Sequence, residues 1–415
     1  MNILLIHQYF LEPGDGGGSR FNEMTKVWVA EGHRVEVLAG MVHYATGEKR
    51  PEYRGKRFAR RVQEGVDVIR CDVSDDYNAS FAGRLKGYFS FVASSLQAGL
   101  FKLARRPDVI LVTSPPLFVG ITSFALSLFK RVPVIFEVRD LWPESAIDTG
   151  VLTSRPLIRA AYWFEGLMYR RARLINVLTP AFRTKLVADK GVPERKVIFI
   201  PNAADFSLAE AVAADFDREA FRRNRGWTDR VVITYVGAHG VANHLDQLLD
   251  AAALLRESDP EVHFVLIGGG MRKADLQRRA AEEGLANVEF IDSVPKAEVF
   301  RYISASDFGA SVLKRVDTFK TIYSNKTFDY MACRVPVLLA IDGVSRELVE
   351  AADCGAFIEP EDPADFARVV RGYLARPRDA WREQGENGYR YATEHFDRTR
   401  LAREYLHHLE VVARG

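Results

Sequence analysis

Residues 262–270 read Val-His-Phe-Val-Leu-Ile-Gly-Gly-Gly, a largely apolar run of strand length that is closed by three glycines. Such runs are typical of parallel strands that are buried on both faces of a sheet. A glycine turn after the strand lets the backbone come close to a ligand, although glycine also punctuates many ordinary turns. The stretch therefore predicts a buried strand, followed either by a ligand-binding turn or by a plain one.

Similar runs recur along the chain, each followed by a turn and a longer helical pattern. In the first half, the expected strands are Asn2–Ile6, Arg34–Leu38, Val66–Arg70, Asp108–Thr113, Val132–Val138, Leu174–Leu178 and Lys196–Ile200. After a polar helical stretch, the expected strands are Val231–Val236, Val262–Ile267, Val288–Ile291, Asp307–Ala310, Val335–Ala340 and Gly355–Ile358. A regular alternation of strand and helix predicts doubly wound parallel α/β sheets.

The alternation of strands and helices stops near residues 201–225, which indicates a connection between two domains. A strand-helix-strand unit occupies about 30 residues, and each half of the chain holds several such units. The sequence predicts two Rossmann-like, doubly wound α/β domains that face each other across a cleft, residues 1–203 and residues 204–394. The C-terminal segment, about residues 395–415, looks helical and can pack back on the first domain.

The composition is that of an ordinary globular protein, with 47% hydrophobic and 27% charged residues in a chain of 415. No secretory leader follows Met1, and the three cysteines are widely spaced, so we expect a reducing, cytoplasmic location. Residues 1–200 carry 29 Lys and Arg against 20 Asp and Glu, whereas residues 201–415 carry 28 against 35. The basic half suits phosphorylated ligands or anionic lipid, and the acidic half argues against nucleic acid as a partner.

A second glycine-rich turn, residues 14–18, follows the first expected strand and precedes a helix that begins near Arg20. Amides at a helix N-terminus suit an anion, so this turn is a candidate ligand site, with a flexible turn as the alternative. The glycine spacing departs from G-x-G-x-x-G, and the second strand ends without an acidic residue that would hold a ribose. These two departures disfavour a nicotinamide-dependent dehydrogenase.

Residues 319–337 contain a lysine at an unusual position in an expected helix. Ser324 or Asn325 can cap a helix there, which puts Lys326 in the first turn, where structural helices usually prefer acids. A cation at this positive helix end makes sense if a phosphate also binds. Asp329 lies three residues further on the same face. The pair predicts a nucleotide-binding site, with a surface salt bridge as the alternative.

Two further pairs of charged residues are candidates for chemistry. Arg139 and Asp140 follow an expected strand and should project into the cleft, where Asp140 would orient or deprotonate a substrate hydroxyl and Arg139 would bind a phosphate or another part of the substrate. A helix N-cap is the alternative for this pair. Asp215 and Asp217 form a D-x-D, but they lie in a charged helical stretch and are interpreted as a solvated face. No metal site is predicted.

Together these elements resemble the family 4 retaining glycosyltransferases of the GT-B fold, over nearly the full chain. The resemblance rests on the two glycine turns, on Ile200-Pro201-Asn202, on Tyr235-Val236-Gly237 and above all on Lys326 to Val337. It implies a cytoplasmic enzyme that moves a sugar from a nucleotide diphosphate, expected to be UDP, without a metal or other cofactor. Residues 136–145 resemble the bacterial branch that transfers fucosamine-type N-acetylated amino sugars to lipid-linked glycans in O-antigen and capsule assembly.

The chain departs from the family pattern at two places. The family usually has two glutamates separated by seven residues, which here fall on Thr321 and Asp329, so the carboxylate near the donor sugar is absent. It also usually has an Arg and a Lys after the first strand of the second domain, whereas residues 237–244 read Gly-Ala-His-Gly-Val-Ala-Asn-His. The diphosphate charge is then expected to fall on Lys326, Lys320 and the backbone N–H groups near Gly240 and residues 16–18.

The resemblance implies catalytic roles for Arg139, Asp140 and Lys326. The substrates are expected to contact Gly16, Gly17, Gly18, Arg20, Gly240, Gly268, Gly269, Gly270, Lys320, Thr321, Lys326 and Asp329. Basic residues beside aromatics over 49–61 and 81–106 indicate peripheral contact with an anionic membrane surface on its inner face, or else an ordinary amphipathic helix. A nucleotide-sugar epimerase and a non-catalytic nucleotide-sugar-binding protein stay open as alternatives.

Overall fold

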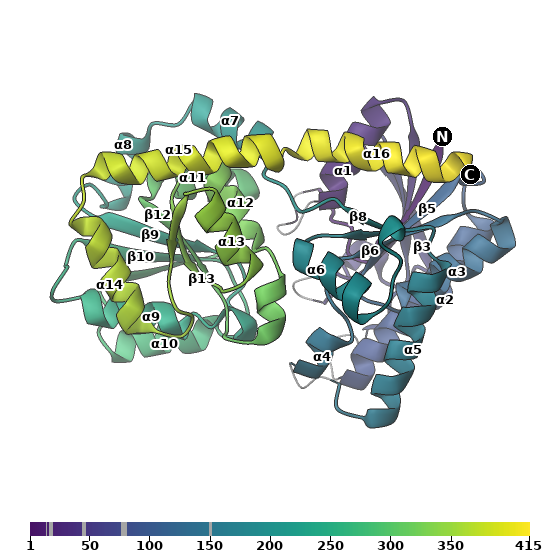
Figure 1. Ribbon diagram of the computed structural model, residues 1–415, viewed down its shortest axis with the longest axis horizontal. Coiled ribbons are helices and arrows are strands. Elements are labelled where there is room, and N and C mark those ends of the chain that lie inside the picture. The colour runs from purple at the N-terminus through teal and green to yellow at the C-terminus, as the bar shows by residue number, and fades with distance from the viewer. Residues whose placement is uncertain (14, 16–19, 44–46, 76–80, 149–151) are drawn as a thin grey trace. The chain divides into compact units, whose positions relative to one another are not determined.

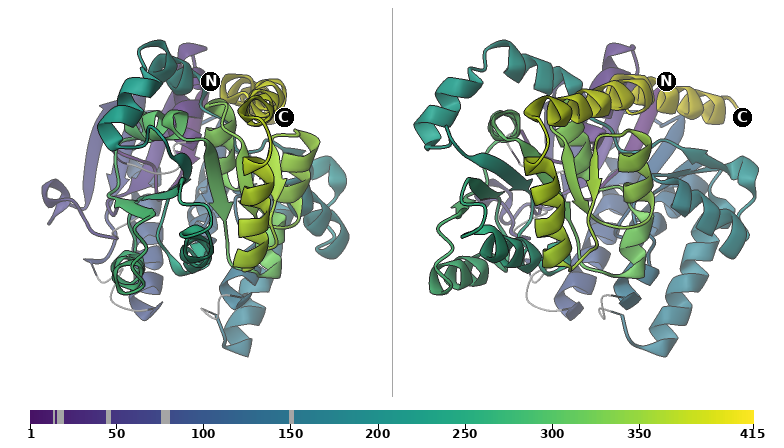
Figure 2. Two further views of the ribbon diagram at one scale, coloured as in Figure 1. Left: turned by 90° about the vertical axis from the view of Figure 1, so that its left-hand side faces the viewer. Right: turned by 60° about the vertical axis from the view of Figure 1, so that its left-hand side comes forward.

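The computed structural model describes the whole chain except residues 14, 16–19, 44–46, 76–80 and 149–151. The chain divides into two compact units, Met1–Pro201 with Thr399–Gly415 and Asn202–Arg398. The sequence predicts that the two domains end at residues 203 and 394. Each unit has its own sheet with helices packed on both sides of it (Figures 1 and 2).

The first unit is built on an eight-stranded sheet with the order β3-β4-β2-β1-β5-β6-β7-β8. The strands are β1 (Asn2–Ile6), β2 (Arg34–Gly40), β3 (Phe58–Gln63), β4 (Val66–Cys71), β5 (Val109–Ser114), β6 (Val134–Val138), β7 (Leu174–Val177) and β8 (Val197–Phe199). Neighbouring strands are parallel except for β3 and β4. Strands β5 and β6 are buried at every position, which explains their continuous Val, Ile and Leu runs.

The sequence pattern does not predict strand β3, because residues 49–61 indicate either a membrane-facing stretch or an amphipathic helix. It pairs with β4 in an antiparallel hairpin whose register joins Gln63 to Val66, so the loop is Glu64-Gly65. Both loop residues have positive φ, 51° and 82°, as a type I′ turn requires. An edge strand has only one neighbour and half of its side chains face water, and for this reason β3 lacks an apolar run.

The helices of the first unit are α1 (Arg20–Ala30), α2 (Phe81–Phe101), α3 (Val119–Lys130), α4 (Glu144–Asp148), α5 (Arg155–Arg171), α6 (Pro180–Thr184) and α16 (Arg398–Arg414). Helix α16 packs on α1, because the indole Nε1 of Trp28 donates to the Ala402 carbonyl at 2.8 Å. The buried ring of Tyr405 lies 5.9 Å from the Trp28 ring, edge to face. The end of the chain is therefore part of the first unit.

The second unit has a six-stranded parallel sheet with the order β11-β10-β9-β12-β13-β14. The strands are β9 (Val231–Val236), β10 (Val262–Ile267), β11 (Val288–Ile291), β12 (Phe308–Val312), β13 (Val337–Ala340) and β14 (Gly355–Phe357). This is the strand order 3-2-1-4-5-6 of the doubly wound nucleotide-binding folds, in which ligands bind beyond the carboxyl ends of the strands. The predicted fold class, two Rossmann-like α/β domains, is confirmed.

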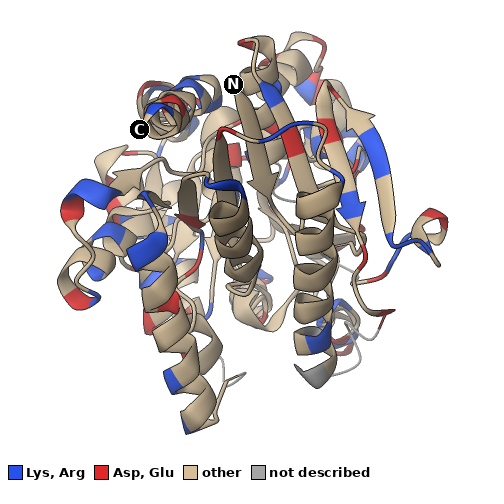
Figure 3. Cartoon of the chain, turned by 90° about the vertical axis from the view of Figure 1, so that its right-hand side faces the viewer, with Lys and Arg blue, Asp and Glu red and all other residues tan. Residues whose placement is uncertain are grey.

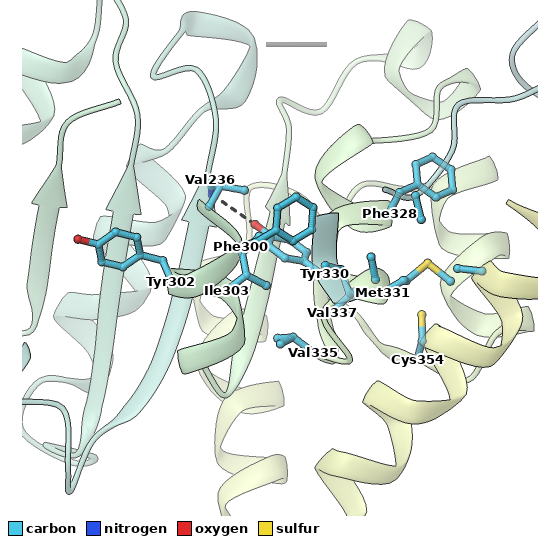
Figure 4. Packing of buried hydrophobic residues seen from close by; sticks show 14 of the residues in the cluster. Val236, Phe300, Tyr302, Ile303, Phe328, Tyr330, Met331, Val335, Val337 and Cys354 are labelled. Atoms are coloured by element: carbon cyan, nitrogen blue, oxygen red, sulfur yellow. Dashed lines mark hydrogen bonds between the residues drawn. The ribbon is translucent and has the colours of Figure 1, made fainter. Parts of the chain in front are cut away.

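The helices of this unit are α7 (Phe206–Ala214), α8 (Arg218–Arg225), α9 (Asp246–Leu255), α10 (Lys273–Glu282), α11 (Lys296–Ala305), α12 (Asn325–Ala332), α13 (Val344–Ala351), α14 (Pro363–Leu374) and α15 (Arg378–His395). Two apolar clusters fill the two faces of the sheet. Figure 4 shows part of one, in which Phe328, Tyr330 and Met331 anchor α12. The Tyr330 hydroxyl donates to the Ala310 carbonyl and accepts from the Val236 amide, which ties α12 to β12 and β9.

Candidate functional site

The two loops that follow β9 and β10 pack against each other backbone to backbone. The His239 amide donates to the Gly269 carbonyl at 2.8 Å. A Cβ on Gly268 would lie 1.9 Å from the Gly237 carbonyl oxygen, and one on Gly270 would lie 2.6 Å from the His239 carbonyl oxygen. Both glycines also have positive φ, 143° and 149°. The close approach of the two loops explains why Gly268 and Gly270 are glycines.

Lys273, the first residue of α10, holds this loop pair in place. Its ammonium group donates to the Gly268 carbonyl at 2.8 Å, to the Ile291 carbonyl at 2.9 Å and to the Asp292 carboxylate at 2.6 Å. The same cation acts on His239, which is fully buried. Burial and then the Lys273 charge lower the pKa of His239 to about 4, so this imidazole is neutral at physiological pH.

Lys326, in the first turn of α12, lies beside the β9 loop. Its Nζ atom lies 5.0 Å from the centroid of the Tyr235 ring, and its Cε atom lies 3.5 Å from where a Cβ on Gly237 would be. Among the residues that the structure describes, no carboxylate is within ion-pairing distance of this ammonium group. Burial lowers its pKa to about 8, opposed by Asp329. The result is a partly desolvated cation at a helix N-terminus, with no carboxylate paired to it in the described part of the chain.

Asp329 lies one turn further along α12 and has a cation of its own. Its Oδ1 atom lies 3.7 Å from the ammonium nitrogen of Lys296. The same lysine lies 3.1 Å from Asp205, which in turn lies 3.4 Å from Arg398. These charges join α12 to the segment that begins the second unit and to the one that ends it. The Asp329 side chain, 21% exposed, is thus held in place and still accessible.

The other predicted residues of this unit are arranged less tightly. Lys320 is exposed, and its ammonium group is 3.0 Å from the Asp317 carboxylate. The Thr321 hydroxyl donates to the Thr318 carbonyl at 2.6 Å. Gly240 precedes the short 3-10 turn Val241–Asn243. A Cβ added to Gly269 would not clash with the backbone, since the nearest atom to it would be a Ser293 hydroxyl at 3.3 Å. The donor contacts of these four residues stay predictions.

In the first unit, Arg139 and Asp140 follow the carboxyl end of β6. An Arg139 nitrogen lies 3.1 Å from Nε2 of the buried His7, at the end of β1. The Asp140 carboxylate accepts from the Ser145 hydroxyl at 2.8 Å. Burial raises the pKa of Asp140, although Ser145 and the Leu141 amide work against this rise. A carboxylate with a raised pKa is a better proton acceptor, so the arrangement suits a general base.

Arg20 is engaged within the protein. It pairs with both carboxylate oxygens of the fully buried Glu137, each at 3.2 Å, and donates to the Ile200 carbonyl at 2.7 Å and to the Pro201 carbonyl. Asn176 donates to the same carboxylate at 2.9 Å. The structure therefore gives Arg20 a role in fixing the last residues of the first unit. The accompanying Gly16, Gly17 and Gly18 lie outside the described residues.

Sequence reasoning missed Glu137, Lys273 and Lys296, which position the residues it did name. Glu137 is a charged residue inside an otherwise apolar strand, a pattern that signals a buried partner. The predicted solvated face at Asp215 and Asp217 is more specific than expected, because Asp217 caps α8 by accepting from the Ala220 amide at 2.9 Å. Within the described ranges, no group of three or more His, Cys, Asp or Glu side chains is placed to share a metal ion.

Two family models match the chain. A Glycosyl transferase 4-like domain matches residues 15–203, and a Glycosyl transferases group 1 domain matches residues 230–376. The chain carries two glycosyltransferase domains and has the GT-B fold. None of the helices in the described part of this glycosyltransferase has both the length and the apolar character that crossing a membrane requires.

The glycosyltransferase is similar to several known proteins. It is 23% identical to WcaI of Escherichia coli K12, named for colanic acid biosynthesis, over 98% of this chain and 99% of that one. It is 27% identical to a GDP-mannose-dependent alpha-(1-6)-phosphatidylinositol monomannoside mannosyltransferase of Mycolicibacterium smegmatis, over 78% and 87% of the two chains. Its fold matches HepE of Anabaena, solved with UDP-glucose, with a TM-score of 0.72, 18% identity and coverage of 99% and 100%.

Proposed function

We propose that this glycosyltransferase moves a sugar from a UDP-linked donor to a hydroxyl group of a lipid-linked glycan, with retention of the anomeric configuration and without a metal ion. The observation that carries the proposal is the ammonium group of Lys326, desolvated at the N-terminus of α12 without a carboxylate partner in the described structure. A diphosphate supplies the missing negative charge, and the helix dipole adds to the attraction.

In this proposal the second unit binds the donor. Negative charge develops on the diphosphate as the sugar leaves, and the Lys326 ammonium group neutralises it. Asp329 accepts from the ribose hydroxyls, with Lys296 holding its carboxylate in place. The loops after β9 and β10 approach the phosphates with backbone N–H groups, Gly240 and Gly269 being the positions without a packing demand of their own. UDP is favoured because the structural neighbour HepE was solved with UDP-glucose.

The first unit binds the acceptor. Asp140, held by Ser145, orients the acceptor hydroxyl and takes its proton, and Arg139 binds a phosphate or sugar group of the acceptor. Surface-polysaccharide synthesis is the proposed context, because the relative WcaI is named for colanic acid biosynthesis. A lipid-linked acceptor is in line with the M. smegmatis relative, whose name contains a phosphatidylinositol acceptor. We propose an amino sugar of the fucosamine type as the donor sugar.

Peripheral contact with the inner face of the membrane is part of the proposal, and we propose a surface other than residues 49–61 for it. The basic residues of 49–61 are largely occupied, since Arg60 and Arg61 pair with four carboxylates and Lys49 with two. At the carboxyl ends of α2 and α3, by contrast, Phe101 and Phe129 are 75% and 73% exposed. The adjoining cations are Lys102, Arg105, Lys130 and Arg131. Figure 3 shows long helical stretches without charged residues on this side.

A metal-free transfer assay tests the proposed function. Purified protein, in buffer with a chelator, is mixed with UDP-N-acetylfucosamine, other UDP-sugars and GDP-mannose, with an undecaprenyl-diphosphate-linked sugar as acceptor. We expect acceptor-dependent release of UDP and a product with retained configuration by NMR. Conversion of the donor without acceptor would instead indicate an epimerase. Binding without turnover across the panel would indicate a nucleotide-sugar-binding protein.

Binding to vesicles tests the membrane contact separately. We expect the protein to sediment with phosphatidylglycerol vesicles and to stay in solution with phosphatidylcholine vesicles. Replacing Phe101 and Phe129 by Ser should abolish sedimentation and leave UDP binding unchanged. Equal sedimentation of this variant and the wild type would contradict the proposed surface.

A further inference from the structure

A cavity of the first unit lies alongside α5, and none of the residues proposed above to contact the donor or the acceptor lines it. It has a volume of about 600 Å³, within the range of about 300–1,000 Å³ that is typical of small-molecule sites. Its wall comes from α5 on one side and from residues 189–193 on the other. Glu144 adds a further part of the wall at the start of α4.

A network of buried and partly buried charged side chains lines this cavity. The Lys190 ammonium group lies 2.6 Å from a carboxylate oxygen of Glu144 and 2.6 Å from one of Glu165. The Tyr169 hydroxyl donates to Glu165 at 2.7 Å. The Glu165 side chain is only 3% exposed, yet it is fully satisfied. Glu144 is not, because its Oε2 atom is buried without a hydrogen-bond partner. One carboxylate oxygen of the network is thus without a hydrogen-bond partner in the described structure.

The chemistry of the wall indicates what kind of ligand fits. Its charged side chains balance, three acidic against three basic: Glu144, Glu165, Asp189, Arg170, Lys190 and Lys196. A balanced wall has no net attraction for a phosphate or for an amine. Carboxylates beside an ammonium group suit hydroxyl groups, which donate and accept at once. The ring of Tyr162, 40% exposed and 5.3 Å from the Lys190 nitrogen, offers a partly apolar face.

We propose that this cavity binds an uncharged sugar residue of the acceptor glycan, remote from the hydroxyl that reacts. Its place in the chain supports the acceptor as the source of that sugar. Glu144 follows Asp140 by four residues, in the segment that leads from the proposed base into α4. Binding energy from a remote part of a substrate can be used to orient its reacting group. The inference rests on the proposed function, in which Asp140 faces the acceptor.

Sugar binding in solution tests the inference on the full chain. The probes are the methyl glycosides of glucose, galactose, mannose, fucose and N-acetylglucosamine, with glucosamine and glucose 6-phosphate as charged comparators, in saturation-transfer NMR and competition titrations. The variants are Tyr162→Ala and Glu144→Gln. Trp163→Ala is the matched control, because Trp163 is the next aromatic residue of α5, is 65% exposed and does not line the cavity.

We expect at least one neutral glycoside to bind the wild type and Trp163→Ala equally, and to bind Tyr162→Ala and Glu144→Gln about tenfold more weakly. UDP binding, measured on the same samples, should be unchanged in all three variants. Absence of binding by every neutral glycoside, equal binding by all variants, or a preference for a charged comparator would overturn the inference. Lys326→Met should lose UDP binding and still bind the glycoside. This variant therefore separates a failure of the proposed donor site from a failure of the proposed sugar site.

Discussion

The ammonium nitrogen of Lys326 lies 5.0 Å from the centre of the Tyr235 ring, across the gap between the start of α12 and the end of β9. An aromatic face attracts a cation by about 1 kcal/mol at exposed sites and by about 2 kcal/mol when the cation is desolvated, and it does not replace a counter-ion. The Tyr235 ring therefore contacts the Lys326 ammonium group without neutralising its charge. This arrangement is expected of a residue that binds an anionic ligand.

Replacing Lys326 by Met keeps the apolar stem and removes the charge. We expect UDP affinity, measured by calorimetry, to fall by about a hundredfold, because the diphosphate loses a desolvated partner. Arg301→Met removes an exposed cation from α11 and serves as the control, with unchanged affinity. Lys320→Met tests how much the second predicted cation contributes to UDP affinity. A loss for Lys320→Met that exceeds the loss for Lys326→Met would transfer the principal role to Lys320.

The affinity for UDP should depend on pH through Lys326. Its lowered pKa of about 8 means that the free protein is charged there below pH 8 and increasingly neutral above it. UDP affinity should therefore fall as the pH rises through about 8, while the terminal phosphate remains dianionic. Lys326→Arg, which keeps its charge throughout, should remove this fall. A wild-type affinity that is level over the same range would show that this amine does not meet the diphosphate.

Gly268 and Gly269 form a matched pair for the loop packing. Gly268→Ala places a Cβ 1.9 Å from the Gly237 carbonyl oxygen at a φ of 143°, so we expect a loss of about 3 kcal/mol in stability and loss of UDP binding. Gly269→Ala meets only a hydroxyl at 3.3 Å and should cost less than about 1 kcal/mol. Thermal unfolding and UDP titration give both readouts. Equal stability of the two variants would argue against the packing described here.

Asp140→Asn tests the proposed base. Removal of general-base catalysis should lower kcat of the transfer reaction by about 10²–10⁴-fold and leave UDP affinity unchanged. Glu194→Gln, an exposed carboxylate that pairs with Arg183 in the same unit, is the control. If Asp140→Asn retains wild-type kcat, the proton must go to another group.

The buried pair of Arg20 and Glu137 should matter for stability. Glu137→Ala leaves an unpaired guanidinium in a buried site, which costs about 3–5 kcal/mol. The double variant Arg20→Met/Glu137→Met should recover part of this loss, because neither charge is then stranded. Thermal unfolding of the first unit, followed as its own transition in calorimetry, measures the difference. A double variant that is less stable than Glu137→Ala would contradict this account of the pair.

The sequence predicted both sheets well, because strands buried on two faces need uninterrupted apolar residues. Strand boundaries shifted where the apolar run did not coincide with the ladder, as in β12, which was expected over Asp307–Ala310 and lies at Phe308–Val312. Asp307 instead pairs with Arg218 and Arg222. Strand β3 escaped prediction because an edge strand needs no such run, although the Glu64-Gly65 turn was a usable signal.

Individual residues of the candidate site were named more readily than their partners. Lys326 stood out from local sequence alone, because a lysine in the first turn of a helix is unusual. The engagement of Arg20 could not be predicted in this way, since its partner Glu137 lies 117 residues away in the chain. The same holds for Lys296 and Asp205, which are separated by 91 residues. Long-range ion pairs depend on the register of the whole sheet, and no local pattern encodes them.

A crystal structure of the protein with UDP tests the central claim most directly. We predict that the diphosphate lies within hydrogen-bonding distance of the Lys326 ammonium group, beside the loop of residues 237–240 and without a bound divalent cation. A UDP molecule whose phosphates lie away from the first turn of α12, or whose phosphates are held by a divalent cation instead of by Lys326, would contradict the account.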